Sequence, residues 1–176
     1  MVNEDIAKLV ASHPFLSDLP GNTAELVSGC ARHVAIGSGL RLLREGEPAN
    51  SLYLLRRGRV SLELRTPGRG ALVVETLGPG AALGLSWLFP PYRWQFDARA
   101  LEPVGAIEVD AACFRAKMEA DPAFGYALVK RLTSIMLQRL QATRRRLLEL
   151  YSEAGPSAQA DLVRSSPGLY RGGAAV

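Results

Sequence analysis

The stretch that decides the fold is LGPGAALGLSWLFPPYRWQFDARA, residues 77–100. Gly78, Gly80 and Gly84 punctuate its first part, and a short apolar run from Leu85 to Phe89 follows. Glycines let a backbone approach a ligand closely and leave N–H groups bare at a helix start, where anions are favoured. The stretch therefore predicts a strand, a tight turn, one turn of helix, a loop and another strand, an arrangement that could cradle a phosphate. The same pattern is typical of a Gly/Pro-rich corner between two strands, and the local residues alone favour that second interpretation.

The composition is that of one ordinary globular domain with its own core. The chain has 176 residues, of which 48% are hydrophobic and 22% are charged. It contains no long uncharged apolar run, and residues 1–10 lack a secretory pattern, so we expect a cytoplasmic location and no membrane partner. The net charge of +4 is compatible with an anionic partner without identifying one. Cys30 and Cys113 are far apart in sequence and lie among apolar residues, so we interpret them as buried thiols.

Residues 1–33 predict an N-terminal helical segment, because apolar residues recur at helical spacing on both sides of Pro14. The two histidines of the chain, His13 and His33, fall in this segment. No second ligand lies at a metal-binding spacing from either of them. We therefore interpret both as surface or helix-end residues and predict no metal site.

Residues 34–109 predict a sandwich or barrel of short strands, since Gly- and Pro-containing turn signals separate apolar runs at regular spacing. Val60, Leu62 and Leu64 alternate with polar residues, which is the pattern of a half-buried strand. The five predicted runs are 40–43, 51–55, 59–64, 71–77 and 96–109.

Residues 110–151 return to helical spacing. Asp110 and Asp121 each predict an N-cap, and a proline in the first turn follows the second one. The helix from 122 to 151 would be about 45 Å long. Its apolar stripe predicts pairing with a second copy of the chain, although a helix folded back on its own domain is the alternative. The stripe consists of Val129, Leu132, Met136, Leu140, Thr143, Leu147 and Leu150.

Three arginines, residues 144–146, lie on this long helix. They could contact nucleic acid, but without a recognition element they would supply only non-specific attraction, so a solvated helix face is favoured. Residues 152–176 are small, polar and glycine-rich, which predicts a disordered tail that is too short for a helix-turn-helix domain. We therefore expect no specific DNA binding. The sequence contains no recognisable nucleophile–base pair, metal-ligand cluster or Walker-type loop, so we do not expect an enzyme.

The order of elements and several motifs resemble the cyclic nucleotide-binding domain, the sensor module of catabolite-activator and FNR-type regulators and of protein kinase A regulatory subunits. The resemblance covers residues 14–151 and rests on LLREGEPANSLYLLRRGRVSLEL, residues 42–64, and on LGPGAALG, residues 77–84. It implies a mainly β fold with flanking helices: a β-roll (double-stranded β-helix or jelly roll) with N-terminal helices and a long C-terminal dimerisation helix. The positions that match the family's spacing are Gly39, Gly46, Tyr53, Gly58, Val60, Gly80 and Gly84.

The expected organisation has four parts. These are an N-terminal helical segment (1–33), a cyclic nucleotide-binding-like β-roll (34–109), C-terminal helices (110–151) and a disordered tail (152–176).

The resemblance also implies a ligand site. Its residues would be Gly84, Leu85, Ser86, Trp87, Arg93, Trp94 and Thr143. In the family, a glutamate after the last glycine accepts a hydrogen bond from the ribose 2′-hydroxyl, and here that position is Leu85. Losing one such charge-assisted bond costs about 1.5–3 kcal/mol. The backbone N–H groups of Ser86 and Trp87 would face the cyclic phosphate, whereas the bulk of Trp87 could fill the cavity.

The position of the family's phosphate-binding arginine corresponds to Trp94 in this sequence. Arg93 is the residue directly before that position. A one-residue shift on a strand reverses the face to which a side chain points, although a loop after two prolines could absorb it. Thr143 aligns with a threonine that contacts the base in bacterial relatives. Thr143 is equally well interpreted as a small residue in the seam of the long helix.

Three functions stay open at this point. The first is a dimeric sensor with a degenerate phosphate-binding cassette that binds cAMP, cGMP or another small anionic ligand weakly. The second is a ligand-free dimerisation and protein-interaction module, in which Leu85, Trp87 and Trp94 fill the pocket. The third is an accessory transcriptional regulator that acts through a protein partner which the sequence does not identify.

Overall fold

The computed structural model describes residues 2–19, 21–66, 68 and 70–153. These residues belong to two compact units, and the chain passes from the first to the second between Leu132 and Thr133. The first unit holds all the strands. The second begins within the long C-terminal helix, and the predicted disordered tail lies outside the described residues from 154 onward.

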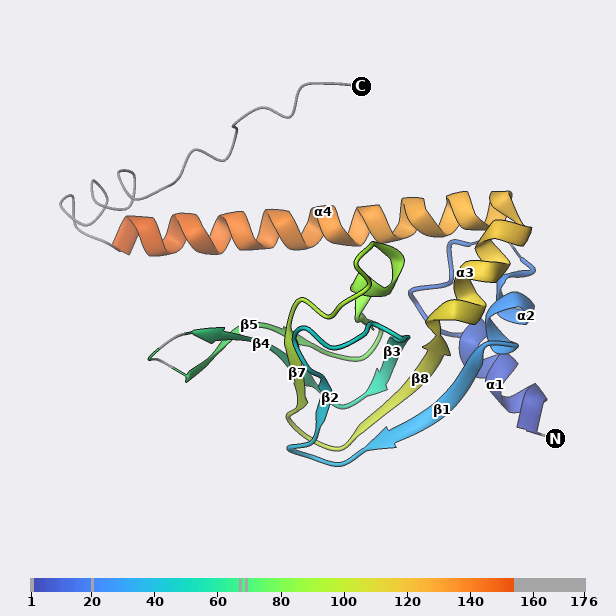
Figure 1. Ribbon diagram of the computed structural model, residues 1–176, viewed down its shortest axis with the longest axis horizontal. Coiled ribbons are helices and arrows are strands. Elements are labelled where there is room, and N and C mark those ends of the chain that lie inside the picture. Colours follow the sequence, from blue (N-terminus) through green and yellow to red (C-terminus); the bar gives the residue numbers. More distant parts are fainter. Residues whose placement is uncertain (1, 20, 67, 69, 154–176) are drawn as a thin grey trace, which may run out of the picture. The chain divides into compact units, whose positions relative to one another are not determined.

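Two four-stranded antiparallel sheets form a β-roll in the first unit (Figure 1). One sheet has the order β1-β8-β3-β6 and the other has the order β2-β7-β4-β5. The roll confirms the fold that was predicted from the sequence. The strands are β1 (Ala31–Ile36), β2 (Arg41–Leu43), β3 (Ser51–Arg57), β4 (Val60–Thr66), β5 (Gly70–Leu77), β6 (Ala82–Leu83), β7 (Asp97–Ala100) and β8 (Val104–Asp110).

The pairing of β4 with β7 shows how the sequence alternation builds this roll. Leu62 pairs with Ala98, and both are buried on the apolar core face. The next pair, Glu63 with Asp97, lies on the opposite face, because successive side chains of a strand point to opposite sides. The predicted half-buried pattern of β4 is therefore wrong for its first four residues: Ser61 and Glu63, on the polar face, are only 0% and 8% exposed, and the Ser61 hydroxyl donates a hydrogen bond to Glu63 Oε1 at 2.7 Å.

Two boundaries differ from those expected. β1 begins at Ala31, inside the segment expected to be helical, because Ala31 pairs with Val109 at the end of β8. His33 accordingly lies exposed on a strand. The run 96–109, expected to be continuous, is divided between β7 and β8, where Pro103 has no N–H to donate to a ladder.

The helices are α1 (Val2–Ala11), α2 (Thr23–Ser28), α3 (Ala111–Ala120) and α4 (Pro122–Glu153), and a short 3-10 helix, η1 (Leu85–Leu88), follows β6. Both predicted aspartate caps are confirmed. Asp110 accepts a hydrogen bond from the Cys113 N–H at 2.7 Å, and Asp121 accepts one from the Phe124 N–H at 3.0 Å. These bonds satisfy N–H groups that have no partner within their own helix.

Helix α4 changes character at the boundary between the two units. Leu132 is only 2% exposed and belongs to the core of the first unit, so its expected place in an exposed apolar stripe is wrong. Thr133, four residues after Val129, takes the place of Leu132 as the next residue on the same side of the helix. Among the described residues, no helix is both long enough and apolar enough to cross a bilayer.

Cys30 and Cys113 form a disulfide, so their interpretation as buried thiols is wrong. Their Cα atoms are 5.7 Å apart although 83 residues separate them in sequence. The start of β1 lies beside the end of β8, and α3 begins directly after β8. Strand pairing therefore brings the two sulfur atoms together, and the sequence spacing alone gives no sign of it.

Candidate functional site

The candidate site is the cassette, residues 78–94, which lies between β5 and β7 in the chain and packs against α3. β6 pairs with β3 and ends at Gly84, whose φ of 86° and ψ of 47° put it in the left-handed region. A glycine adopts that conformation without a steric penalty from Cβ, and η1 begins at the next residue. The predicted strand, tight turn and single turn of helix are all present.

Trp94 packs directly on the backbone of Gly84. A Cβ atom added to Gly84 would lie 2.8 Å from Cζ3 of Trp94 and 3.3 Å from the carbonyl oxygen of Ser51. Trp94 itself is only 7% exposed. The indole ring thus fills the space over the glycine turn, and not even a methyl group fits between them.

Arg93 is exposed and donates a hydrogen bond from Nη1 to the carbonyl oxygen of Gly46 at 2.7 Å. Its neighbour Trp94 exchanges backbone hydrogen bonds with the same loop: the Gly46 N–H donates to Trp94 O, and the Trp94 N–H donates to Glu47 O, both at 2.9 Å. Arg93 and Trp94 together join the end of the cassette to the loop 44–47. The arginine is therefore already engaged by a backbone carbonyl.

Asp97, at the start of β7, also anchors the loop 44–47. Its carboxylate accepts hydrogen bonds from the Glu45 N–H at 2.8 Å and from Nε of Arg65 at 3.2 Å, and Nη2 of Arg41 lies 3.8 Å away. Burial alone would raise the pKa of Asp97, but the Glu45 N–H and the two arginines outweigh it and hold that pKa below its ordinary value. The carboxylate stays charged and fixes the loop.

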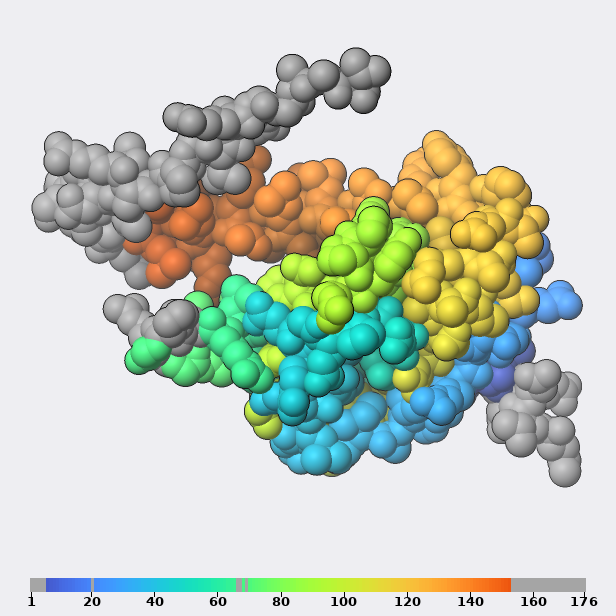
Figure 2. Space-filling model, viewed as in Figure 1, coloured from blue at the N-terminus to red at the C-terminus, as the bar shows by residue number. Residues whose placement is uncertain are grey.

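Trp87 connects the cassette to the helices. It is fully buried, and its ring lies 5.2 Å from the ring of Phe114 on α3. The Trp87 carbonyl accepts a hydrogen bond from Nη1 of Arg115 at 2.8 Å, and the same guanidinium lies 4.8 Å over the ring of Tyr92. In Figure 2 the cassette (yellow-green) forms a protrusion packed against α3 (yellow). The indole Nε1 of Trp87 is buried without a hydrogen-bond partner.

Sequence reasoning did not identify Phe114 and Arg115. Phe114 has the signal of any core residue of an amphipathic helix, and nothing near Arg115 in sequence marks it. Both residues gain their role because α3 follows β8, which places the first turn of the helix beside the cassette. That placement is a property of the fold.

The remaining predicted site residues lie in two different helices. Leu85 and Ser86 are half-buried in η1. Thr143 lies on the part of α4 that belongs to the second unit, and its hydroxyl donates to the Arg139 carbonyl at 2.9 Å. The structure thus brings together Gly84, Trp94 and the η1 turn, and it gives Thr143 an intrahelical bond.

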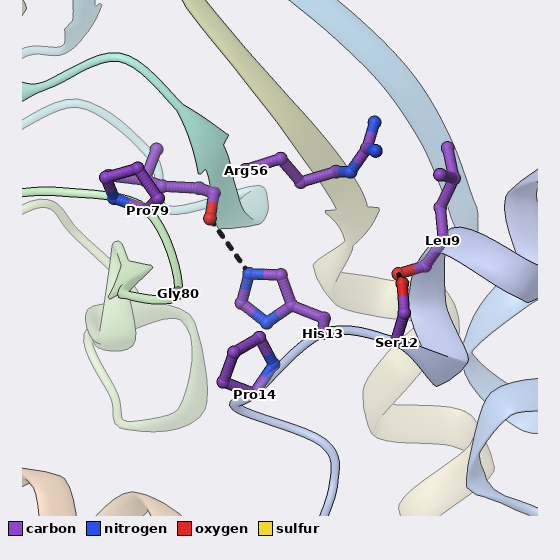
Figure 3. Close-up of a pocket in the computed structure, with 8 residues that line it drawn as sticks. Leu9, Ser12, His13, Pro14, Arg56, Pro79 and Gly80 are labelled. Carbon is purple, nitrogen blue, oxygen red and sulfur yellow. Dashed lines mark hydrogen bonds between the residues drawn. The ribbon is translucent and has the colours of Figure 1, made fainter.

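A cavity of about 260 Å³ lies between the end of α1 and the start of the cassette at Pro79–Gly80 (Figure 3). His13 lines this cavity and is only 3% exposed, so the expected surface position is wrong, whereas the expected position at a helix end is correct, because α1 ends at Ala11. Nε2 of His13 bonds to the Leu55 carbonyl at 3.0 Å, and Nδ1 accepts the Phe15 N–H at 3.2 Å. This pair of bonds fits a neutral imidazole with its proton on Nε2.

The electrostatics of His13 agree with that assignment. Burial lowers the pKa of His13 and Arg56 lowers it further, while the bond to the Leu55 carbonyl opposes both effects.

A second cavity, of about 200 Å³, is lined by residues 41–44 and Glu47. Neither cavity is lined by residues 84–94. Within the described residues, no group of three or more His, Cys, Asp or Glu side chains could hold a metal ion.

The sequence model of the cyclic nucleotide-binding domain matches residues 34–121, half of the chain. Glutaminase 2 of Bradyrhizobium diazoefficiens is 31% identical over 105 residues, which make up 60% of this chain and 16% of that protein. The CRP-like cAMP-activated global transcriptional regulator of Mycobacterium tuberculosis is 25% identical over 112 residues, 64% of this chain and 48% of the regulator. The chain therefore spans about half the length of that regulator and less than a fifth of the glutaminase.

Solved structures share the same architecture. A cyclic nucleotide-binding domain from Methylobacillus flagellatus superposes with a TM-score of 0.69 at 20% identity, over 84% of this chain and 83% of that one. The matched region of the family's sequence model contains the loop 44–47, the cassette and α3, which are the elements that build the candidate site. On the strength of that match and of the two-sheet roll, the chain belongs to the cyclic nucleotide-binding domain family.

Proposed function

We propose that this chain is a regulatory module whose nucleotide pocket is filled by its own Trp94, so that its output does not depend on cAMP or cGMP. One observation carries the proposal: the Trp94 ring lies 2.8 Å from where a Cβ of Gly84 would be. A cyclic phosphate that used the glycine turn would have to expel an indole that is 7% exposed. Exposing an aromatic side chain of this kind costs about 2–3 kcal/mol, which weakens binding about 30- to 150-fold.

Two further contacts support the same conclusion. Leu85 offers no acceptor to a ribose hydroxyl. Arg93 would have to give up its 2.7 Å bond to the Gly46 carbonyl before it could pair with a phosphate. Each loss adds to the cost of expelling Trp94.

The second part of the proposal is that two copies of the chain pair through α4. From Val129 onward, the stripe repeats at alternating spacings of four and three, which is the heptad pattern of a left-handed coiled coil. Its apolar members are exposed by 39–57% of their surface. They are Val129, Met136, Leu140, Leu147 and Leu150. Thr133 and Thr143 complete the repeat, which supports the interpretation of Thr143 as a seam residue.

Titration calorimetry and thermal melts with cAMP and cGMP test the first part. A ligand at one hundred times its dissociation constant adds about 2.7 kcal/mol of stability. We expect no heat and no change in melting temperature at millimolar nucleotide. A saturable heat with either nucleotide, together with a rise in melting temperature, would overturn the proposal.

A matched pair of variants makes the test sharper. Leu85→Glu combined with Trp94→Arg restores both side chains that the family resemblance implies, and we expect measurable cAMP binding. Leu85→Glu alone keeps Trp94 in place, so we expect this single variant to show no measurable cAMP binding. If the single variant binds as well as the double variant, Trp94 does not block the pocket.

A second candidate function is the sensing of a small inorganic anion, favoured by the unpartnered Nε1 of Trp87. A buried donor without an acceptor costs about 1–3 kcal/mol, and an anion that reached it would recover part of that cost. We expect phosphate to shift the indole proton resonance of Trp87, which Trp87→Phe would identify by its loss. An unmoved resonance at high phosphate removes this candidate.

A further inference from the structure

We propose that Cys30 and Cys113 form a reversible dithiol–disulfide site that controls how firmly α3 is held to the β-roll. The proposal goes beyond the function proposed above and does not depend on whether a nucleotide binds. It assigns an oxidant as the input to this module. Its basis is the placement of the two sulfur atoms between the roll and the helix that contacts the cassette.

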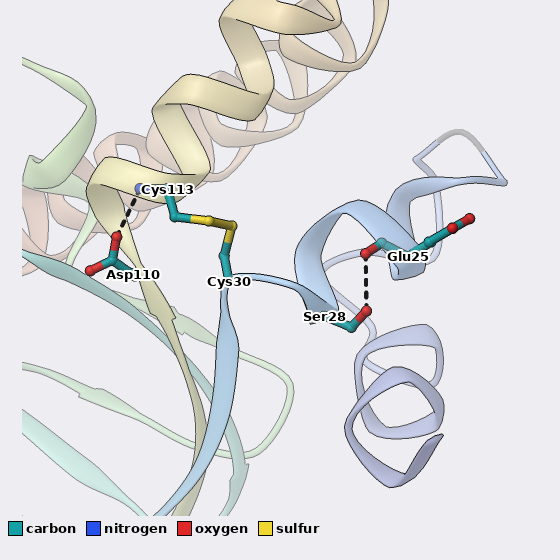
Figure 4. The surroundings of a disulfide bond; sticks show 5 residues. All are labelled: Glu25, Ser28, Cys30, Asp110 and Cys113. Atoms are coloured by element: carbon teal, nitrogen blue, oxygen red, sulfur yellow. Dashed lines mark hydrogen bonds between the residues drawn. A yellow bond between two sulfur atoms is a disulfide. The ribbon is translucent and has the colours of Figure 1, made fainter. Parts of the chain in front are cut away.

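The backbone around the disulfide is held in place by hydrogen bonds. The Cys30 N–H donates to the Val27 carbonyl, and the Asp110 N–H donates to the Cys30 carbonyl, both at 2.9 Å. On the other side, the Cys113 N–H donates to the Asp110 carboxylate at 2.7 Å (Figure 4). The two cysteines therefore stay close when the sulfur–sulfur bond opens, and the bond can form again without refolding.

Both cysteines lie near the surface, and a lysine lies beside one of them. Each is half-buried. A Cβ added to Gly29 would lie 3.8 Å from Nζ of Lys117, so the ammonium group lies beside the residue that precedes Cys30. Cys113 is in the first turn of α3, where the helix dipole favours a thiolate. The Asp110 carboxylate, which accepts the Cys113 N–H, opposes this effect.

The redox step is an ordinary thiol–disulfide exchange with a small-molecule disulfide such as oxidised glutathione. The thiolate of Cys113 attacks one sulfur of the oxidant, forms a mixed disulfide and releases one reduced thiol. The thiolate of Cys30 then attacks the Cys113 sulfur and releases the second. Two electrons pass from the protein to the oxidant, and the two cysteine protons end on the two released thiols.

The bond matters because the two residues after Cys113 in α3 both contact the cassette. Phe114 packs on the ring of Trp87, and Arg115 donates to the Trp87 carbonyl. The disulfide thus fixes the helix turn that holds the cassette. In the reduced state, the covalent attachment between α3 and the start of β1 is lost, and α3 is held there by hydrogen bonds and packing alone.

The first experiment determines whether the site is reversible. The full chain is equilibrated in glutathione buffers of graded ratio, quenched with acid, alkylated with a maleimide and weighed by mass spectrometry. We expect two labels in reducing buffer, none in oxidising buffer and a reversible transition between them. A pair that never closes in folded protein overturns the proposal, and so does a pair that stays closed in excess reduced glutathione, which is the behaviour of a permanent structural disulfide.

The second experiment measures the consequence on the same wild-type protein. Hydrogen–deuterium exchange is compared between the oxidised and reduced forms for peptides that cover α3 and the cassette. We expect exchange in the first turn of α3 to be about tenfold faster after reduction. We expect no change in β4, which belongs to the sheet that contains neither β1 nor β8. Cys30→Ser and Cys113→Ser should each match the reduced form in every buffer. Equal exchange in both redox states would show that the bond does not control α3.

Discussion

Gly84 and Gly39 have similar left-handed backbones but different surroundings. Their φ values are 86° and 78°. A Cβ on Gly39 would meet nothing within 4 Å, whereas one on Gly84 would lie 2.8 Å from the Trp94 ring. Comparing alanine at the two positions therefore separates the cost of the backbone conformation from the cost of displacing Trp94.

We predict that Gly39→Ala lowers the free energy of unfolding by about 1–2 kcal/mol, the cost of a left-handed alanine. Gly84→Ala should lower it by about 1–3 kcal/mol more, because it also overpacks the core against the indole. Urea denaturation followed by circular dichroism measures both. Equal losses would mean that Trp94 moves aside freely, which would contradict the filled pocket.

His13 makes a prediction about pH. Its folded-state pKa lies below the ordinary value of 6.5, so below pH 6.5 the unfolded chain binds the proton more readily than the folded one. Stability should therefore fall as pH drops below 6.5, with a slope of at most about 1.4 kcal/mol per pH unit. We predict that His13→Gln lowers the free energy of unfolding at pH 7.5. Between pH 6.5 and 5, the stability of the variant should change less with pH than that of the wild type, as measured by the midpoints of urea denaturation.

The window from pH 6.5 to 5 separates this effect from those of the carboxylates whose pKa values are lowered by hydrogen bonds and arginines. Asp97 and Glu108 have pKa values below their ordinary 3.8 and 4.5, so the stability that they contribute is lost only at lower pH. If wild type and His13→Gln keep parallel midpoints across the window, His13 is not the group that titrates.

At the scale of one element, α4 offers neighbouring leucines with different predicted roles. Leu147 lies in the seam and Leu148 beside it, and they are 52% and 68% exposed. We predict that Leu147→Glu weakens dimerisation strongly, because it places like charges opposite each other in the interface, whereas Leu148→Glu leaves the dimer intact. Sedimentation velocity at several concentrations distinguishes the two. A monomeric wild type would refute the seam altogether.

The sequence predicts elements well where the determining residues are local. Asp110 and Asp121 cap the helices that they were expected to cap. The half-buried pattern expected of β4 is wrong, because the closed roll also buries Ser61 and Glu63 on its polar face. Leu132 was misplaced because a helical stripe does not show where its helix leaves the core. The start of β1 was missed because its pairing partner, β8, lies more than 70 residues away.

At the scale of the whole molecule, the disulfide closes a long loop. Cross-linking residues 83 positions apart removes conformational entropy from the unfolded chain, which is worth about 4 kcal/mol in the loop-closure account. We predict that the double variant Cys30→Ala, Cys113→Ala unfolds at a clearly lower urea concentration than the oxidised wild type. The reduced wild type serves as the control, and its midpoint should fall near that of the double variant. Coincident midpoints for all three would mean that the bond adds nothing to stability.

The candidate site could be predicted only in part from the sequence. The glycine turn, η1 and the slot of Trp94 all fall within the stretch 77–100, where sequence order and spatial order agree. The partners that give the site its character come from elsewhere: Gly46 for Arg93, Phe114 for Trp87, and Leu55 for His13. Those contacts depend on how the two sheets close, and no local pattern encodes them.

Both tryptophans of the chain lie in the cassette, and both are buried, with exposures of 0% and 7%. Light absorbed selectively by indole therefore reports on this loop and on no other part of the protein. With both indoles buried, the fluorescence emission maximum should lie at a shorter wavelength than that of indole in water. Binding of a ligand, protonation or reduction would shift this maximum to longer wavelength if it exposes the cassette to solvent. The two tryptophans are therefore an intrinsic fluorescence probe of the candidate site, and no dye has to be attached.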